Sequence, residues 1–365
     1  MISASYLDSV ADEVEILYST LHQDILKDIA RRVKKTGVLT ATANWQVQML
    51  LEQGQLRNDV IKKIAEFTGS SQTQIKKIFS DTLLESYKAN SYGLSEEQFL
   101  SYSRKALLVG LGKTNATLSN MTGIISNNTA GVFEQVCTRA YMQASSGAFT
   151  YEQVSAFASD ELLRQDIQKI VYSESGRRTS IEGATRRAIV TGLNQTVCES
   201  MLDVAKGLGT NLVETTAHYG AREEHQVWQG QIFSLVGSTK NYPNFYTSTG
   251  YGSVTGLGGA NCRHNFHPYI EGDSRQYSRE QIDKWNDDTV TFNGKEMTYY
   301  DATQTMRNYE RNIRKLKKEK GVHEQMGADV SGYNKQLRAY AKKARELNKQ
   351  TSVPLDYSRR RIARY

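Results

Sequence analysis

Proline is scarce in this sequence and is absent from its first two thirds. The three prolines among the 365 residues are Pro243, Pro268 and Pro354. Residues 1–242 therefore lack the residue that breaks helices most strongly. We expect this long stretch to be mostly helical.

Cysteine and long apolar runs are scarce as well. Cys137, Cys198 and Cys262 are widely spaced and odd in number, which argues against a disulfide-stapled fold and for synthesis in a reducing cytoplasm. No stretch approaches the roughly 18 consecutive apolar residues that a membrane-spanning helix needs. The first residues also carry acids where a signal peptide needs an apolar core. We therefore expect neither a membrane protein nor a Sec-secreted one.

Positive charge is concentrated at the end of the sequence. The formal net charge is +7. Residues 301–365 hold 17 Lys and Arg against 7 Asp and Glu, whereas the first 300 residues hold 29 against 32. The basic character therefore belongs to the last 65 residues.

The hydrophobic pattern predicts a mainly α fold. Apolar residues recur at intervals of three and four over residues 5–35, which is typical of an amphipathic helix. Gly, Ser and Asn pauses, such as residues 69–71 and 126–128, separate further expected helices. These helices cover about 44–67, 72–90, 95–111, 129–145 and 151–172.

The pattern predicts four regions and an elongated molecule. A long connecting helix should cover most of 173–209, and a segment rich in Gly, Tyr and Asn should form short strands and ordered loops. Beyond it, a seven-residue apolar repeat interrupted at Gly321 indicates a basic helical hairpin. The expected regions are a helical N-terminal region at 1–172, the connecting helix at 173–209, a small α+β module at 210–275 and a basic helical C-terminal region at 276–365.

The α+β module holds most of the residues that can carry chemistry. Four of the six histidines and one cysteine lie there: His218, His225, Cys262, His264 and His267. Imidazole and thiolate are the ligands that zinc prefers, so His218, His225, Cys262 and His264 are candidate metal ligands. The spacing limits this interpretation, because His218 and His225 on one helix would be roughly 10.5 Å apart. The alternative is a buried hydrogen-bond network that braces the loops, with Arg222 and Arg263 as donors.

An enzymatic site is the weaker interpretation. A nucleophilic triad can be drawn from Cys262, His225 or His264, and an acid such as Glu223 or Asp273, but spacing does not bring these side chains together. Phosphate-loop, zincin and nucleophile-elbow motifs are absent from the sequence. We expect a protein that is not an enzyme and has no small-molecule substrate. A metal- or cysteine-dependent enzyme centred on residues 218–267 is the alternative.

The basic C-terminal helices suggest contact with nucleic acid. Cationic helices with interleaved tyrosines can neutralise phosphates without reading sequence. The other interpretation is a solvated helix face or one that docks on an acidic partner. The candidate DNA-binding residues are Arg311, Arg314, Lys315, Lys317, Lys318, Lys342 and Lys343.

Three strings within the module occur in a characteristic order and spacing. They are TTAHYGAREEHQVWQGQIFSL, then YPNF with a Gly-rich stretch, then GGANCRHNFHPYIEG. Together they resemble the phage minor capsid protein 2 family, which is related to the Mu-type minor head, or head-morphogenesis, domain. Residues 177–195 and the string YERNIRKLKKEK are similar to the helices that flank this module in the family. The signature core carried over is His218, Gly220, Arg222, His225, Trp228, Gln229, Gly230, Phe233, Cys262, Arg263, His264 and Pro268.

The resemblance implies a virion structural protein of a tailed double-stranded DNA phage, made in the host cytoplasm. It implies a place at the portal vertex or capsid interior, with portal protein and major capsid protein as partners. Contact with packaged double-stranded DNA, and a part in DNA packaging or ejection, are further expectations. No cofactor is implied. Whether the four candidate metal ligands hold zinc or brace the loops stays open at this point.

Overall fold

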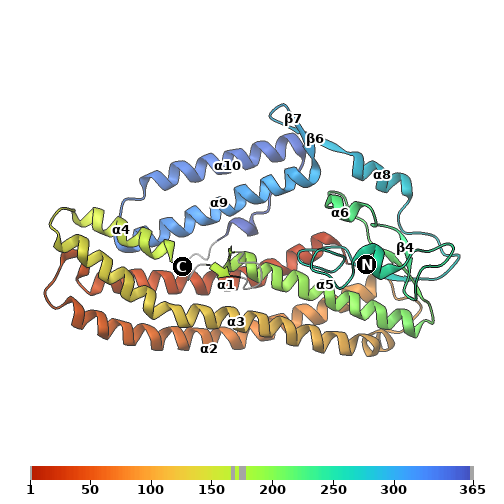
Figure 1. The fold of residues 1–365 in the computed structure, drawn as a ribbon, viewed down its shortest axis with the longest axis horizontal. Coiled ribbons are helices and arrows are strands. Elements are labelled where there is room, and N and C mark those ends of the chain that lie inside the picture. Colours follow the sequence, from red (N-terminus) through yellow and green to blue (C-terminus); the bar gives the residue numbers. More distant parts are fainter. Residues whose placement is uncertain (1, 166–168, 172–177, 362–365) are drawn as a thin grey trace.

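The computed structural model describes residues 2–165, 169–171 and 178–361. Long helices lie side by side along an elongated molecule, and most of the short antiparallel strands lie toward one end (Figure 1). The predicted fold class, mainly α with a small α+β module, is confirmed. The predicted region boundary at 172/173 lies outside the described residues.

Four helices and a short 3₁₀ turn build the N-terminal region. The stripe predicted over residues 5–35 forms the first helix, which Ser3 caps and in which Arg32, Lys34 and Lys35 occupy the last turn. Cations suit that end of the helix dipole. The elements are α1 (Ala4–Lys35), η1 (Val38–Thr40), α2 (Trp45–Ala89), α3 (Glu96–Ser145) and α4 (Tyr151–Arg164).

The two pauses predicted within this region are wrong. Helix α2 runs through residues 69–71, and α3 runs through residues 126–128. Gly in a helix interior costs only about 1 kcal/mol, and Ser70 and Ser71 donate to carbonyls of the preceding turn without breaking the helix. At 1.5 Å per residue, α2 and α3 are therefore roughly 68 and 75 Å long.

The helix predicted at 151–172 is shorter than expected, whereas the connecting helix covers most of 173–209 as predicted. Helix α4 ends at Arg164, and a two-stranded antiparallel sheet follows, with β1 (Lys169–Val171) paired to β2 (Arg178–Ser180). Ser180 then caps α5 (Ile181–Gly207). Helix α5 packs against α1 and α3 and forms the floor of the α+β module.

The module is a three-stranded antiparallel sheet with short helices around it. The central strand β3 (Leu212–Thr215) pairs with β4 (Ile232–Ser234) on one side and with β5 (Phe266–Tyr269) on the other. Helices α6 (Glu223–Gln226) and α7 (Phe245–Thr249) lie in the intervening loops. The expected α+β module is therefore present, and β5 rests on α5.

The C-terminal region contains more than the predicted hairpin. Helix α8 (Arg279–Asp287) and a β-hairpin of β6 (Thr289–Phe292) and β7 (Lys295–Thr298) precede it and were not predicted. The hairpin itself is α9 (Tyr299–Met326) and α10 (Ser331–Thr351), followed by η3 (Ser358–Arg360). Helix α9 passes through Gly321, so the predicted interruption there is wrong; the turn comes at Gly327, whose φ of 78° suits glycine.

One hydrophobic core runs through all four regions. It includes Val14 of α1, Phe133 of α3, Leu193 of α5, Phe266 of β5 and Met326 of α9. A second, smaller cluster joins α9 to α10 through Met306 and Leu347. The module is therefore packed into the helical array rather than tethered to it. Among the described residues, no helix is both long and apolar enough to cross a membrane.

Candidate functional site

Three of the four candidate metal ligands converge at one point. The Nδ1 atoms of His225 and His264 are 3.3 Å apart, and the Cys262 Sγ lies 3.8 Å from each of them. All three side chains are buried, with 2% of His225 and 1% of Cys262 and His264 exposed. We call these three residues the His/Cys cluster. The fourth candidate, His218, is outside this group.

A turn at Gly220 brings the two halves of the first motif together. Gly220 has a φ of 72°, so His218 and His225 do not share a helix. The His218 ring instead stacks on the His264 ring with centroids 4.2 Å apart, and the His225 ring is 5.2 Å from His264. The separation of two helical turns, which limited the metal interpretation, therefore does not apply.

Asn194 of α5 positions the segment that carries Cys262 and His264, and the sequence analysis does not single this asparagine out. Its Nδ2 donates to the carbonyl oxygens of Cys262 at 3.1 Å and His264 at 2.8 Å. The neighbouring Gln195 donates to the Gly258 carbonyl at 3.1 Å. The sequence did show an Asn-Gln-Thr string in the helix that is similar to one in the family. The carbonyl groups to which Asn194 donates could not be known without the fold.

Gln229 and Trp228 enclose the cluster on the side of α6. The Gln229 Oε1 accepts from the backbone N–H of His218 at 3.1 Å and lies 3.2 Å from the His264 Nε2. Its Nε2 donates to Asn286 at 2.8 Å, which fixes the orientation of the amide. The Trp228 ring lies 4.6 Å from the His225 ring and 4.8 Å from the His264 ring.

Burial sets the protonation of these groups. It lowers the pKa of His218 to about 4, lowers the pKa of His225 and lowers that of His264 well below its ordinary value. The same burial raises the pKa of the Cys262 thiol. At neutral pH and without a metal, the imidazoles are neutral and the sulfur is protonated. A buried thiol with a raised pKa is a poor nucleophile.

The other signature residues build the scaffold of the module. A Cβ on Gly230, which has a φ of 63°, would lie 2.3 Å from the Ile282 Cδ1. Phe233 packs edge-on against Phe245, and Pro268 pairs with Val213 across the sheet. The Arg222 guanidinium lies 2.9 Å from the His225 Nε2. His267, paired with Glu214 at 3.5 Å, lies outside the His/Cys cluster.

A surface cavity of about 380 Å³ lies beside the module, between β4 and α8. Gln229, Tyr242, Arg275, Ile282 and Asn286 are among its lining residues. None of the three cluster residues lines it. The His/Cys cluster is therefore not at the bottom of this cavity.

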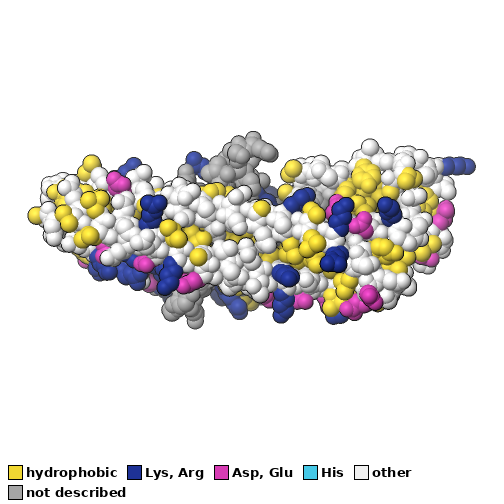
Figure 2. All heavy atoms as spheres, turned by 90° about the horizontal axis from the view of Figure 1, so that it is seen from below, with side chains coloured by type: hydrophobic (Ala, Val, Ile, Leu, Met, Phe, Trp, Pro, Cys, Tyr) yellow, Lys and Arg dark blue, Asp and Glu magenta, His cyan; other side chains and the backbone are white. Residues whose placement is uncertain are grey.

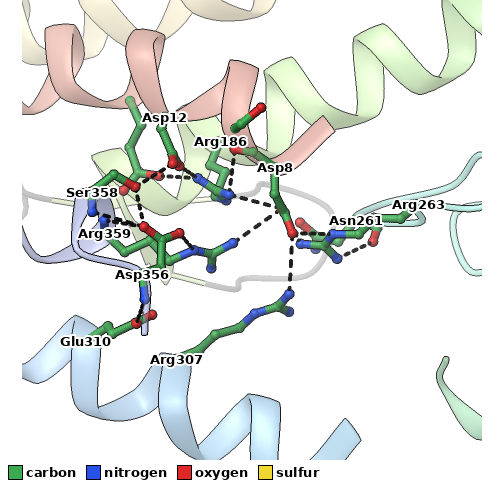
Figure 3. A network of polar contacts seen from close by, with 12 residues as sticks. Asp8, Asp12, Arg186, Asn261, Arg263, Arg307, Glu310, Asp356, Ser358 and Arg359 are labelled. Atoms are coloured by element: carbon green, nitrogen blue, oxygen red, sulfur yellow. Dashed lines mark hydrogen bonds and ion pairs between the residues drawn. The ribbon is translucent and has the colours of Figure 1, made fainter. Parts of the chain in front are cut away.

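Arg263 joins the module to the rest of the protein through Asp8. The Asp8 carboxylate of α1 accepts from Arg263 at 2.7 Å, Arg186 of α5 at 3.0 Å and Arg359 of η3 at 3.2 Å. Arg307 of α9 approaches it to 4.0 Å (Figure 3). Burial by itself would raise the pKa of Asp8, but these arginines hold the pKa well below its ordinary value.

The seven candidate DNA-binding residues differ in how exposed they are. Arg314 is buried in an ion pair with Glu15, and Lys318 in one with Glu182. Including these two in an exposed basic face is therefore wrong, because α9 packs this side on α1. Lys317 donates to the Arg360 carbonyl at 2.6 Å. The remaining four candidates, Arg311, Lys315, Lys342 and Lys343, are exposed.

Comparison with known proteins assigns the family. A family model described as phage minor capsid protein 2 matches residues 2–349. The chain belongs to this family. The assignment made from the histidine and cysteine strings is thereby confirmed, and it extends to the N-terminal helices, which carried no motif.

Members of phage minor capsid protein 2 are phage structural proteins, and this chain is therefore a component of the virion. A structural protein of Lactococcus phage LL-H is 24% identical over 308 residues, covering 80% of this chain and 76% of that protein. A structural protein of Lactococcus phage mv4 is 29% identical over 134 residues, covering 33% of this chain and 93% of that protein. No solved structure matches the chain.

Proposed function

We propose that the protein is a head-morphogenesis component of a tailed double-stranded DNA phage, located at the portal vertex or in the capsid interior. In this proposal, α2 and α3 engage portal protein or major capsid protein, and α10 faces the packaged DNA. The observation that carries it is the presence of two chemically different surfaces on opposite edges of one elongated body. Helices α2 and α3 form one edge, and α10 forms the other (Figure 1).

The edge built by α2 and α3 presents apolar side chains to solvent. Val47, Leu50 and Leu51 of α2 are each more than half exposed, as is Leu108 of α3. Figure 2 shows hydrophobic side chains scattered along this face among lysines and arginines. Val47, Leu50 and Leu51 are spaced three and four residues apart, so they lie on one side of α2, and grouped exposed apolar side chains mark surfaces that another protein covers. They support contact with a virion protein along these helices.

The opposite edge is strongly basic. Six lysines and arginines of α10 are exposed, against a single acid, Glu346. Each phosphate that such a surface neutralises releases condensed counterions, which makes binding favourable and dependent on salt. The exposed cations of α10 are Lys335, Arg338, Lys342, Lys343, Arg345 and Lys349.

The enzyme alternative has less support. The cluster side chains are buried, the thiol has a raised pKa, and the neighbouring cavity is lined by other residues. A substrate would have to open the core of the module to reach Cys262. A structural role agrees better with these observations.

Incorporation into the particle is the first test. Mass spectrometry of purified virions should find peptides of this chain together with those of portal and major capsid proteins. Replacing Leu50 and Leu51 by Gln should lower the amount incorporated, because α2 would lose apolar contact area. The double variant Val236→Gln/Val254→Gln changes two exposed apolar residues of the module loops and should incorporate normally. Absence of the chain from particles would contradict the proposal and favour a scaffold that stays outside.

DNA contact is tested separately with the purified full chain and duplex DNA of random sequence. Lys342→Gln/Lys343→Gln should weaken retention and reduce the salt slope by up to about 2, since each phosphate contact contributes about 0.9. Lys76→Gln/Lys77→Gln removes the same charge from exposed positions on α2 and should leave the slope unchanged. Equal effects of both pairs would show that only net charge matters and would refute the assignment to α10.

A further inference from the structure

We propose that His225, Cys262 and His264 bind one zinc ion through Nδ1, Sγ and Nδ1, and that this ion fastens α6 to the loop before β5. The site is independent of the virion contacts proposed above. It lies inside the module, between two segments that share no secondary structure.

The separations of the three atoms fit a zinc ion. With Zn–N bonds of about 2.05 Å and a Zn–S bond of about 2.3 Å, tetrahedral geometry requires an N···N distance of about 3.3 Å and N···S distances of about 3.6 Å. The observed distances are 3.3 Å between the nitrogens and 3.8 Å from the sulfur to each nitrogen. An ion can therefore be accommodated by shifts of a few tenths of an ångström.

The hydrogen bonds behind His264 leave its Nδ1 without a proton. Gln229 Oε1 already accepts the backbone N–H of His218, and its amide nitrogen is committed to Asn286. The atom that faces His264 Nε2 is therefore an acceptor, so Nε2 carries the proton. The Nδ1 lone pair then points at His225 and Cys262, which is the arrangement that metal-binding histidines use.

The outer nitrogen of His225, Nε2, contacts one acceptor and one donor. Its Nε2 lies 3.0 Å from the Thr255 carbonyl oxygen, which can only accept. A proton on Nε2 satisfies that carbonyl and turns a second Nδ1 lone pair toward the first. Two lone pairs 3.3 Å apart in a buried site repel each other, and a cation between them removes the conflict. Arg222, which also lies near Nε2, must then turn to the Thr255 carbonyl or to solvent.

The ligand set of the site suits a zinc ion, and burial of the three side chains separates that ion from any substrate. One thiolate with two neutral imidazoles is a ligand set that zinc prefers. Among the described residues the cluster has no fourth His, Cys, Asp or Glu, and the His218 ring, stacked on His264, covers one side. A water molecule completes the coordination in this proposal. Because the ligands come from two loops, binding adds directly to the stability of the module.

The test uses the full chain made without a chelating tag in zinc-supplemented medium. Elemental analysis should find about one zinc per chain, as expected for a single site. Exchange with cobalt(II) should give the ligand-field absorption of a four-coordinate ion and a thiolate charge-transfer band. Cys262→Ala should lose both the metal and the band. Cys198→Ala removes the buried cysteine of α5 instead and should keep them.

A second measurement covers the case in which Cys262→Ala does not fold. The wild-type chain, stripped with a chelator, should lose melting temperature and regain it when zinc, but not magnesium, is returned. Metal-free protein that is equally stable, or a cobalt spectrum without a thiolate band, would overturn the proposal. Either result would favour the hydrogen-bond network and would leave the virion assignment untouched.

Discussion

At the residue scale, His267 shows how burial controls the response of this protein to acid. It lies on β5 opposite Glu214 of β3, with its Nε2 3.5 Å from the carboxylate. Its Nδ1–H donates to the Pro268 carbonyl at 3.0 Å. Burial lowers the pKa of His267 to about 4 and raises that of Glu214. The imidazole is therefore neutral in the folded protein.

We expect His267 to make the fold less stable in acid. The unfolded chain, with a histidine pKa of about 6.5, binds a proton that the folded chain excludes until about pH 4. The free energy of unfolding should therefore fall as pH drops from about 6.5 to 4, by at most about 3 kcal/mol for this group. In the His267→Gln variant, the urea concentration at the unfolding midpoint should change less with pH over this range. A steeper profile in the variant would mean that Glu214 holds the imidazole charged.

Asn194 carries a second prediction at this scale. It is fully buried, and its Nδ2 serves the carbonyls of Cys262 and His264 together. Asn194→Ala removes the amide donor from two buried carbonyls and should lower the free energy of unfolding by about 2–3 kcal/mol. Gln195→Ala, at an exposed position, should cost less than about 1 kcal/mol. If chemical denaturation gave the same loss of unfolding free energy for both variants, Asn194 would have no special bracing role.

The residues of the candidate site could be predicted from the sequence, but not how they come together. The histidine- and cysteine-bearing strings indicate the segments from which the structure brings His225, Cys262 and His264 together. The helical spacing argument nevertheless separated His218 from His225, since it could not include the turn at Gly220. The contribution of Asn194 depends on how α5 crosses under the loop, which only the tertiary fold determines.

At the element scale, the closest packing is between α3 and α5. A Cβ on Gly110 of α3 would lie 1.9 Å from the Thr196 Oγ1 of α5, and one on Gly192 of α5 would lie 2.1 Å from the Thr114 Oγ1 of α3. Each helix therefore places a threonine side chain against a glycine of the other helix. This reciprocal contact explains the glycines at positions 110 and 192.

We expect opposite effects from two alanine substitutions on α3. Gly110→Ala should destabilise the protein by about 1–3 kcal/mol, because the added methyl group overpacks the α5 interface. Gly112→Ala places its Cβ in open space and should stabilise the helix by up to about 1 kcal/mol. Melting temperatures of the two variants give the comparison. A stabilising Gly110→Ala would contradict the packing described here.

The same elements show why helix ends were harder to predict than helices. The glycine, serine and asparagine pauses predict breaks in α2 and α3, yet both helices continue through them. Packing against neighbouring helices outweighs a local cost of about 1 kcal/mol. The hairpin of α9 and α10 followed from its seven-residue repeat, whereas the short β6–β7 hairpin has too few residues to produce a clear period.

At the scale of the whole molecule, Asp8 joins segments that are distant in sequence. Its neighbours Arg186, Arg263, Arg307 and Arg359 come from α5, the module, α9 and η3 (Figure 3). Composition predicted a basic C-terminal region, but part of its charge is used inside the protein. The sequence pattern of α1 gave no sign of this role, because an acid near a helix start is explained equally well by the helix dipole.

We expect loss of the Asp8 charge to weaken the whole assembly. Asp8→Asn leaves four arginines around a neutral amide, and removing one partner from a largely buried ion pair should cost about 3 kcal/mol. Burial and repulsion from the neighbouring arginines already lower the pKa of Arg307 to about 9. The arginines therefore repel one another, and the Asp8 charge offsets that repulsion. Urea denaturation followed by tryptophan fluorescence and by far-UV circular dichroism measures the loss. The exposed Asp81→Asn on α2 serves as the control and should change stability by less than about 0.5 kcal/mol.

The two probes also test whether Asp8 acts on the module alone or on the whole protein. Because one hydrophobic core runs from α1 to α9, both signals should shift together in Asp8→Asn. Above about pH 4 the wild-type carboxylate is charged and its full contribution is present. Since the arginines hold its pKa below the unfolded value, the difference between wild type and Asp8→Asn should shrink as pH falls below 4. A constant difference down to pH 2 would show that shape, not charge, is what Asp8 contributes.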